Sequence, residues 1–403
     1  MRNRRSLSNP GGRPKPWGDT ALARVLADCF GVEAPEKLRF THGFHAYPGR
    51  MHPEIAERIL GHFAPKRLAV DPFMGSGTTA VEAVRAGLPY LGSDISRVAL
   101  EIAWTRTRVM PPGECRRVEA EGERIEKVAR SNVDERLPVP SWAEAVRGWF
   151  EPHTLGEIGF LKALIDEGKE PTLRRLLTCV LSSLVVKLSR QASDSVTVLD
   201  PTRQPWPPGA PFRLFREKCA ELTKSLLLLS SDLHKRGVNP REPELRVADA
   251  RELRPASGSV DLVLTSPPYA GTYDYSAHHA LRDALYGAPS VRESREIGTR
   301  RERGAGYRED LTRILGNLLP ALSPEGRIVL LVGDGSVGAV RVEADRLVRD
   351  IARGLGARVP AGASRDQMER TYGRRGERRR EHLIVITASS DRLPTPPAVA
   401  PIA

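Results

Sequence analysis

Short apolar runs of β-type composition alternate along the chain with segments of helical periodicity. The runs that we predict as strands span residues 67–71, 89–94, 245–249, 260–266, 327–334 and 381–388. Strands that alternate with helices build βαβ units, in which helices cover both faces of a parallel sheet. The pattern therefore predicts an α/β fold with a doubly wound, largely parallel sheet.

A long interval separates the second and third predicted strands. Residues 95–244 are far too many for a βαβ connection. Apolar residues at helical spacing predict one helix over 173–188 and another over 218–236 within this interval. Residues 191–213 between them are polar and rich in Pro and Gly, which is typical of a long loop. The interval therefore contains a mainly helical insert.

The ends of the chain differ from the rest in composition. Residues 1–18 are basic and rich in Pro and Gly, and residues 389–403 are rich in Pro and Ala with little to bury. We predict that both are disordered tails. The remaining sequence divides into a core, residues 19–110 together with 241–388, and the insert, residues 111–240.

The charge of the chain points to a polyanionic partner. The 403 residues carry a formal net charge of +12. Clustered Lys and Arg side chains bind nucleic acids because they release counterions from phosphates, although a solvated basic surface is the alternative interpretation. The candidate nucleic-acid contacts are Arg203 in the predicted loop and, before the last predicted strand, Arg374, Arg375, Arg378 and Arg379.

Cysteine and histidine spacing gives no sign of a metal or disulfide framework. The four cysteines lie far apart without CxxC or Cys/His spacing, and His42, His45 and His52 have no companion at ligand spacing. No run of about 18 apolar residues occurs, and the basic start leads into no apolar segment. We therefore expect no metal, no membrane association and a reducing, cytoplasmic location.

The segment AVDPFMGSGTT joins a predicted strand to a predicted helix through a glycine turn. The strand ends at Asp71, and Gly75 and Gly77 let a ligand approach the backbone beside the helix N-terminus. Asp94 ends the next strand. Its spacing in the sequence from Gly75 is close to the spacing at which dinucleotide-binding folds place an acidic residue that accepts both hydroxyls of a ribose. The segment lacks the GxGxxG of NAD sites and the Lys of ATP-binding loops. It therefore predicts a different nucleoside cofactor.

A second unusual segment is TSPPY, residues 265–269, which follows the apolar run VDLVL. One interpretation is a stiff turn that ends a strand. The other is a clamp for a flat, hydrogen-bonding substrate, because two prolines fix φ and hold their neighbouring carbonyl groups rigidly. The segment alone does not decide between them.

DPFMGSGTT together with TSPPY resembles the S-adenosylmethionine-dependent DNA methyltransferases that modify exocyclic amino groups, at N4 of cytosine or N6 of adenine. Residues 42–60 resemble the segment that precedes DPF in that family. The resemblance covers roughly residues 40–110 and 240–388. It implies a Rossmann-like methyltransferase sheet, S-adenosylmethionine as the cofactor and double-stranded DNA as the partner. It also suggests a cognate restriction or defence partner, and makes the insert a candidate target-recognition region.

The resemblance implies roles for individual residues. Asp94 would meet the cofactor's ribose and Asp249 its adenine. The residues expected around the methionine part of the cofactor are Tyr47, Pro48, Asp71, Phe73, Gly75, Ser76, Gly77, Thr78 and Thr79. The expected catalytic clamp is Ser266, Pro267, Pro268 and Tyr269. In this clamp the Ser266 side chain and the Pro267 carbonyl accept hydrogen bonds from the target amine, and Tyr269 stacks on the base.

The target of the reaction stays open at this point. Ser at the first clamp position favours cytosine N4, and adenine N6 is the alternative. An RNA base methyltransferase, a methyltransferase of glutamine amides and a non-catalytic nucleic-acid-binding module are the rival functions. Residues 273–279 are expected to begin a helix beside the clamp, where His278 or His279 is a candidate general base.

Overall fold

The computed structural model describes residues 12–33, 38–131, 137–272, 274–287, 296–299, 304–337, 340–371 and 378–389. Within these residues, eight strands form one sheet in the spatial order β1-β11-β12-β8-β7-β2-β3-β6. Their bounds are β1 Lys15–Gly18, β2 Leu68–Asp71, β3 Tyr90–Asp94, β6 Glu244–Val247, β7 Val260–Thr265, β8 Leu322–Gly333, β11 Arg358–Thr371 and β12 Arg378–Thr387. The five strands from β8 to β6 are parallel, and β12, β11 and β1 extend the sheet in antiparallel fashion. The predicted α/β fold with a largely parallel sheet is confirmed.

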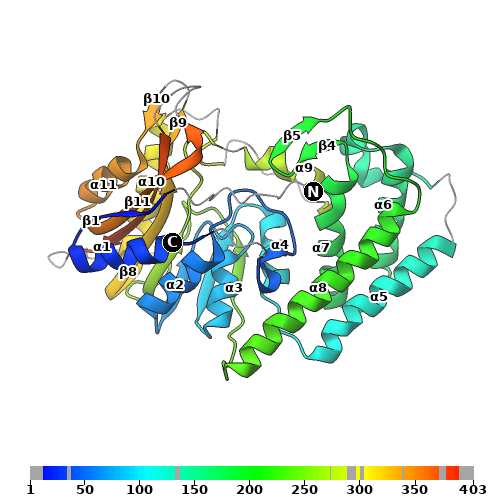
Figure 1. Cartoon of the computed structure of the whole chain (residues 1–403), viewed down its shortest axis with the longest axis horizontal. Helices are drawn as coiled ribbons and strands as arrows, with labels where there is room; N and C mark the ends of the chain where they lie inside the picture. Colours follow the sequence, from blue (N-terminus) through cyan, green and yellow to red (C-terminus); the bar gives the residue numbers. More distant parts are fainter. Residues whose placement is uncertain are drawn as a thin grey trace, which may run out of the picture.

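Helices cover both faces of the sheet (Figure 1). Strand β2 illustrates why, because its successive side chains point to opposite faces. Ala69 belongs to the hydrophobic cluster of one face, and Val70 belongs to that of the other. The helices on the Ala69 face are α1 Thr20–Phe30, α2 Pro53–Phe63 and α3 Thr78–Arg85. Those on the Val70 face are α10 Gly304–Leu318 and α11 Ala344–Gly354.

The insert forms a helical lobe beside the sheet (Figure 1). Its long helices are α5 Pro112–Ser131, α6 Pro152–Asp166, α7 Pro171–Leu188 and α8 Ala210–Lys235. Two helices outside the insert, α4 Arg97–Arg106 and α9 Tyr275–Tyr286, contribute Ile102 and Leu281 to the same hydrophobic cluster. The insert is mainly helical, as predicted, and it shares its interior with the helices that flank the sheet.

Short elements complete the described chain. They are the 3-10 helices η1 Phe40–Gly43, η2 Ser141–Trp149 and η4 Leu319–Ala321, and the hairpins β4 Gln191–Ser193 with β5 Val196–Leu199 and β9 Gly335–Val337 with β10 Val340–Val342. Among the described residues, no helix combines the length and hydropathy needed to cross a membrane.

Three local predictions need correction. Residues 15–18, predicted as part of a disordered tail, form β1, because they pair with β11. The predicted loop at 191–213 contains the β4–β5 hairpin, and its last residues begin α8. Strand β11 was not predicted at all. Residues 1–11 and 390–403, which make up most of the predicted tails, lie outside the described residues.

The order of the strands indicates where a ligand can bind. Strand β2 has β3 on one side and β7 on the other, although β7 follows β3 in the chain. In open α/β sheets, ligands bind outside the carboxyl ends of the strands at such a reversal of strand order. Asp71 ends β2, and Thr265 ends β7.

Candidate active site

The glycine turn between β2 and α3 has the conformation that its sequence requires. Gly75 and Gly77 have positive φ angles of 48° and 79°. A Cβ atom on Gly77 would lie 2.7 Å from the Cβ of Ala103 in α4, so a larger residue cannot fit without displacing that helix. The turn therefore depends on glycine for its backbone conformation and for its close packing.

Asp94 connects the end of β3 to this turn. One carboxylate oxygen accepts the N–H of Gly75 at 3.0 Å, and the other accepts the N–H of Ser96 at 2.8 Å. Burial raises the pKa of Asp94 to about 6, against the lowering effect of these two hydrogen bonds. Each oxygen keeps a lone pair for a further donor.

Arg106 of α4 fixes the other side of the turn. It is fully buried, and its guanidinium donates to the carbonyl oxygen of Ser76 at 3.0 Å and to its hydroxyl at 2.7 Å. The same group donates to the carbonyl of His45. The glycine turn and the segment around Tyr47 are therefore held against one another by a single buried side chain.

Asp71 brings the glycine turn and the TSPPY segment together. Its Oδ1 accepts the N–H of Phe73 at 3.0 Å and the hydroxyl of Thr265 at 2.6 Å. Thr265 directly precedes Ser266, and β2 and β7 are neighbouring parallel strands. Burial raises the pKa of Asp71 to about 6. The two segments singled out in the sequence are thus adjacent in space.

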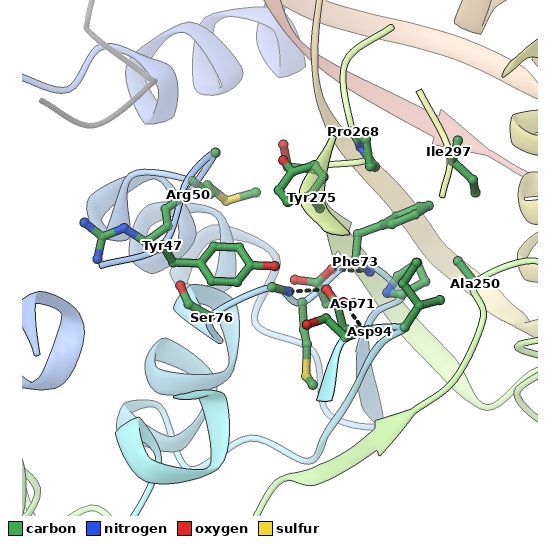
Figure 2. A pocket seen from close by; sticks show the side chains of 18 of the residues that line it. Tyr47, Arg50, Asp71, Phe73, Ser76, Asp94, Ala250, Pro268, Tyr275 and Ile297 are labelled. Carbon is green, nitrogen blue, oxygen red and sulfur yellow. Dashed lines mark hydrogen bonds between the residues drawn. The ribbon is translucent and has the colours of Figure 1, made fainter. Parts of the chain in front are cut away.

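Both segments line one open pocket, whose empty volume including its solvent-exposed mouth is about 940 Å³. Figure 2 shows Asp71, Asp94 and Tyr47 around it, with Pro268 and Tyr275 above them in that view. The predicted residues that line the pocket are Tyr47, Asp71, Phe73, Gly75, Ser76, Thr78, Thr79, Asp94, Asp249, Ser266 and Pro268.

Four predicted residues do not line this pocket: Pro48, Gly77, Pro267 and Tyr269. Gly77 instead packs on α4. The hydroxyl of Tyr269 donates to Glu381 of β12 at 2.7 Å. The edge of the Tyr269 ring lies against the backbone of Gly333.

Asp249 lines the pocket but is also engaged by a neighbour. Arg251 donates to both of its carboxylate oxygens, at 2.9 and 2.7 Å, and also lies 3.2 Å from Asp310. A ligand that meets Asp249 therefore meets a carboxylate held in a fixed orientation.

Several pocket residues were not predicted. They include Arg50, Tyr275, Ser276 and Glu296. Glu296 is buried and accepts the N–H of Ser276, while its second oxygen has no hydrogen-bond partner among the described residues. Burial raises the pKa of Glu296, and its charge raises that of Asp94. No motif marks Glu296, because only the fold brings it next to Asp94.

His279, one of the two candidate general bases, lines the pocket from α9. Its Nδ1 lies 2.9 Å from the Ser96 hydroxyl, and burial lowers its pKa to about 3. An imidazole with so low a pKa is a weak base. The geometry therefore favours a hydrogen-bonding role for His279 over proton abstraction.

The candidate nucleic-acid contacts differ in their surroundings. The guanidinium of Arg203 donates to the carbonyls of Val186, Lys187 and Gln191. It therefore caps carbonyl groups at the C-terminus of α7. Arg378 is exposed at the start of β12, and Arg379 donates to the hydroxyl of Ser336.

Arg374 and Arg375 lie outside the described residues. Their expected contacts with nucleic acid, like those of the other three arginines, stay predictions.

One group of side chains away from the pocket has the composition of a metal site. Within the described part of the chain, only Asp334, Asp345 and His382 bring three ligand atoms within 4.8 Å of one another. The Arg380 guanidinium lies 3.8 Å from Asp334 and 4.0 Å from Asp345. A cation bound there would be repelled by this arginine.

Comparison with known proteins gives matches to the part of the chain that contains the glycine turn. The family model described as a DNA methylase matches residues 23–107, which include the glycine turn and Asp94. A type II methyltransferase, M.MjaII of Methanocaldococcus jannaschii, is 21% identical over 392 residues, covering 74% of this chain and 73% of that protein. M.MvaI of Kocuria varians is 24% identical over 40% of this chain and 39% of its own length. M.BsoBI of Geobacillus stearothermophilus is 22% identical over 64% of this chain and 56% of its own length.

These matches agree with the motifs of the sequence and with the geometry of the pocket. The glycine turn and TSPPY, on which the family resemblance rests, meet at the carboxyl ends of β2 and β7. Residues 23–107 thus match the DNA methylase family model, and this match together with the type II methyltransferase relatives supports an amino-methyltransferase of the N4-cytosine or N6-adenine type.

Proposed function

We propose that this protein transfers a methyl group from S-adenosylmethionine to the exocyclic amino group of a base in double-stranded DNA, with cytosine N4 as the target. The observation that carries the proposal is that the cofactor-type turn and the TSPPY segment line the same pocket and are joined by the Thr265–Asp71 hydrogen bond. Adenine N6 is the second candidate, since the family includes both reactions.

The electrostatics of the pocket suit a cationic ligand. Asp71, Asp94 and Glu296 are carboxylates with raised pKa values because of burial, and none has an ion-pair partner among the residues that the structure describes. S-adenosylmethionine carries a positive sulfonium and a positive ammonium group, and the sulfonium makes its methyl group electrophilic. The residues that would hold it are Asp71 and the glycine turn for the methionine part, Asp94 and Glu296 for the ribose, and Asp249 for the adenine.

The TSPPY segment has the groups needed to grip an amine. An aromatic amine is a poor nucleophile because its lone pair is delocalised into the ring. Hydrogen bonds from both amino protons, to the Ser266 hydroxyl and the Pro267 carbonyl, favour a pyramidal nitrogen with an available lone pair. Tyr307 donates to the carbonyl of Pro268 at 2.8 Å, while no described residue donates to the carbonyl of Pro267. Pro267 is buried and does not line the pocket, so the proposal requires its carbonyl to become accessible when the substrate binds.

Duplex DNA as substrate requires further contacts. A base inside a duplex reaches such a pocket only when it is flipped out, and this costs a few kcal/mol. We propose that the insert, residues 111–240, and the basic residues Arg378 and Arg379 contribute to this binding. The charge of +12 supports a polyanionic substrate.

The experiment is to incubate the purified chain with S-adenosylmethionine carrying a labelled methyl group. Duplex DNA, RNA and a protein extract are supplied separately, and labelled nucleosides are identified by mass spectrometry. We expect label in DNA as N4-methylcytosine. Label found as N6-methyladenine selects the second candidate, whereas label confined to RNA or protein contradicts DNA methylation.

A single substitution tests the assignment of the clamp. Ser266→Ala should reduce turnover by about a hundredfold or more, the usual cost of losing a group that acts in the transition state, and leave cofactor affinity unchanged. Ser257→Ala, which alters an exposed serine in the same domain, is the matched control. Full activity in Ser266→Ala would exclude the proposed clamp.

A further inference from the structure

Tyr269, the aromatic residue expected to stack on the target base, is engaged elsewhere in the fold. Its hydroxyl donates to Glu381 of β12 at 2.7 Å, and Glu381 is buried. A Cβ on Gly333 of β8 would come within 2.3 Å of the Tyr269 ring, so the ring packs closely on that strand. Tyr269 does not line the pocket. The stacking role that the sequence predicts for it is therefore open to another side chain.

Tyr275 supplies an aromatic ring inside the pocket. It is half-buried, and it lines the pocket together with Ser266 and Pro268 of the TSPPY segment. The chain reaches it through a turn after this segment, in which the Thr272 N–H donates to the carbonyl of Tyr269 at 3.1 Å. A turn of the chain therefore leads from Tyr269 back to the pocket wall.

Contacts within the first turn of α9 and with the pocket wall fix the position of Tyr275. It is the first residue of α9, and the N–H of the next residue, Ser276, donates to the buried carboxylate of Glu296. The Tyr275 ring packs with the Tyr47 ring, at a centroid distance of 6.3 Å and an angle of 29°. The ring of His279, one helical turn later, lies 6.4 Å from it. Neighbours from two parts of the chain thus orient this ring.

These contacts place Tyr275 between the two halves of the pocket. Tyr47 also covers the glycine turn, because a Cβ on Gly75 would lie 3.1 Å from its ring. In Figure 2 the Tyr275 ring lies between the labelled Tyr47 and Pro268. In the proposed reaction, the cofactor occupies the side of the glycine turn and the amine occupies the side of Ser266. The ring between them borders the space that a flat base needs.

We propose that Tyr275, and not Tyr269, stacks on the flipped target base while Ser266 binds its amino group. This inference rests on the proposed function, and it assigns the aromatic contact to α9. A base that leaves the duplex loses its stacking there, and an aromatic side chain replaces part of it. Such stacking tolerates any base, because every base has a π face. The inference therefore holds for cytosine and for adenine.

The test compares Tyr275→Phe, Tyr275→Leu and Tyr275→Met with the wild-type chain in the DNA methylation assay. Phenylalanine keeps the ring, whereas leucine and the more adaptable methionine keep an apolar side chain without one. We expect kcat/KM for DNA to stay within about threefold in Tyr275→Phe and to fall on the order of ten- to a hundredfold in the other two. The cofactor dissociation constant, measured by calorimetry without DNA, should change little in all three.

Three results would overturn the proposal. Wild-type kcat/KM in Tyr275→Leu or Tyr275→Met would show that the ring is not needed, and the methionine variant keeps this test valid if the leucine variant does not fold. A loss in Tyr275→Phe as large as in the variants without a ring would assign the effect to the hydroxyl. A cofactor dissociation constant raised in proportion to the loss of kcat/KM would place the ring against the cofactor and not against the base.

Tyr286→Leu is the matched control. Tyr286 is the last residue of the same helix, is also half-buried and does not line the pocket. Its replacement should leave kcat/KM for DNA unchanged, and a loss equal to that of Tyr275→Leu would indicate general damage to α9 and contradict the proposal.

The same assay keeps this inference apart from the proposed function. If the wild-type chain methylates DNA and Ser266→Ala abolishes activity while Tyr275→Leu retains it, the stacking inference fails and the proposed function stands. If the wild-type chain transfers no methyl group to DNA, both fail.

Discussion

Replacing Asp71 by Asn should stabilise the protein while weakening its cofactor binding. Both hydrogen bonds that the structure gives to this carboxylate, from the Phe73 N–H and the Thr265 hydroxyl, end on the same oxygen. An asparagine can accept both with its single amide oxygen. The substitution therefore removes a buried charge and keeps the local geometry.

The size of the effect follows from the pKa. Burial raises the pKa of Asp71 from 3.8 to about 6, so the folded protein binds more protons than the unfolded chain between these values. At about 1.4 kcal/mol per pKa unit, the ionised carboxylate costs about 3 kcal/mol of folding free energy above about pH 7. The cost falls to about half at pH 5, and disappears below about pH 4. For a chain of 403 residues, 3 kcal/mol corresponds to a rise in Tm of about 3 °C.

The assay is thermal unfolding of the cofactor-free protein at pH 8 and at pH 5. We expect Asp71→Asn to unfold at the higher temperature at pH 8, with a smaller difference at pH 5, and S-adenosylmethionine to raise its Tm less than that of the wild type. Asp166→Asn, at a half-exposed carboxylate on α6, should change Tm little at either pH. An equal Tm for wild type and Asp71→Asn at pH 8, or a difference that does not shrink at pH 5, would refute the reasoning.

Three further substitutions test the pocket. Asp94→Ala removes the acceptor expected for the ribose and should raise the cofactor dissociation constant about tenfold or more in calorimetry; an unchanged constant would exclude that contact. Glu296→Gln keeps an acceptor for its backbone donor but removes the charge, so it should weaken the binding of S-adenosylmethionine more than that of S-adenosylhomocysteine, which lacks the sulfonium charge; equal losses for both ligands would speak against an electrostatic role. Gly77→Ala introduces a side chain at a φ of 79° and within 2.7 Å of Ala103, and should lower the free energy of unfolding by about 1–3 kcal/mol in urea titration; wild-type stability would contradict the packing argument.

The sequence predicted those parts of the fold that have a strong local pattern. Strands β2 and β7 are apolar runs that end in a distinctive motif, and their bounds agree with the prediction to within two residues. Strand β11 was missed because small and charged residues dominate it. Ala361 and Ala363 are fully buried there, and Gly362 leaves room for the Trp17 ring. Contacts with other elements therefore stabilise this segment as a strand more than the β-propensity of its own residues does.

The site divides in a similar way. Asp71 and Ser266 could be assigned because each belongs to a motif. Glu296 could not, because nothing in the surrounding residues distinguishes it from an ordinary surface glutamate. Its place in the pocket near Asp94 depends on residues that are distant in the chain. Residues of this kind can be found only after the strands have been placed in order.

The sheet itself sets the spacing between the two halves of the proposed reaction. Neighbouring strands lie about 4.8 Å apart. Val70 of β2 pairs with Val263 of β7, so Asp71 lies beside the last residues of β7. The Thr265 hydroxyl bridges them by donating to Asp71 at 2.6 Å, one residue before Ser266. In the proposed reaction, a cofactor at Asp71 and an amine at Ser266 would therefore be positioned by residues at or next to the ends of two paired strands. For this reason we expect catalysis to be more sensitive to changes in this pair of strands than to changes in the insert, which would act on which DNA is bound.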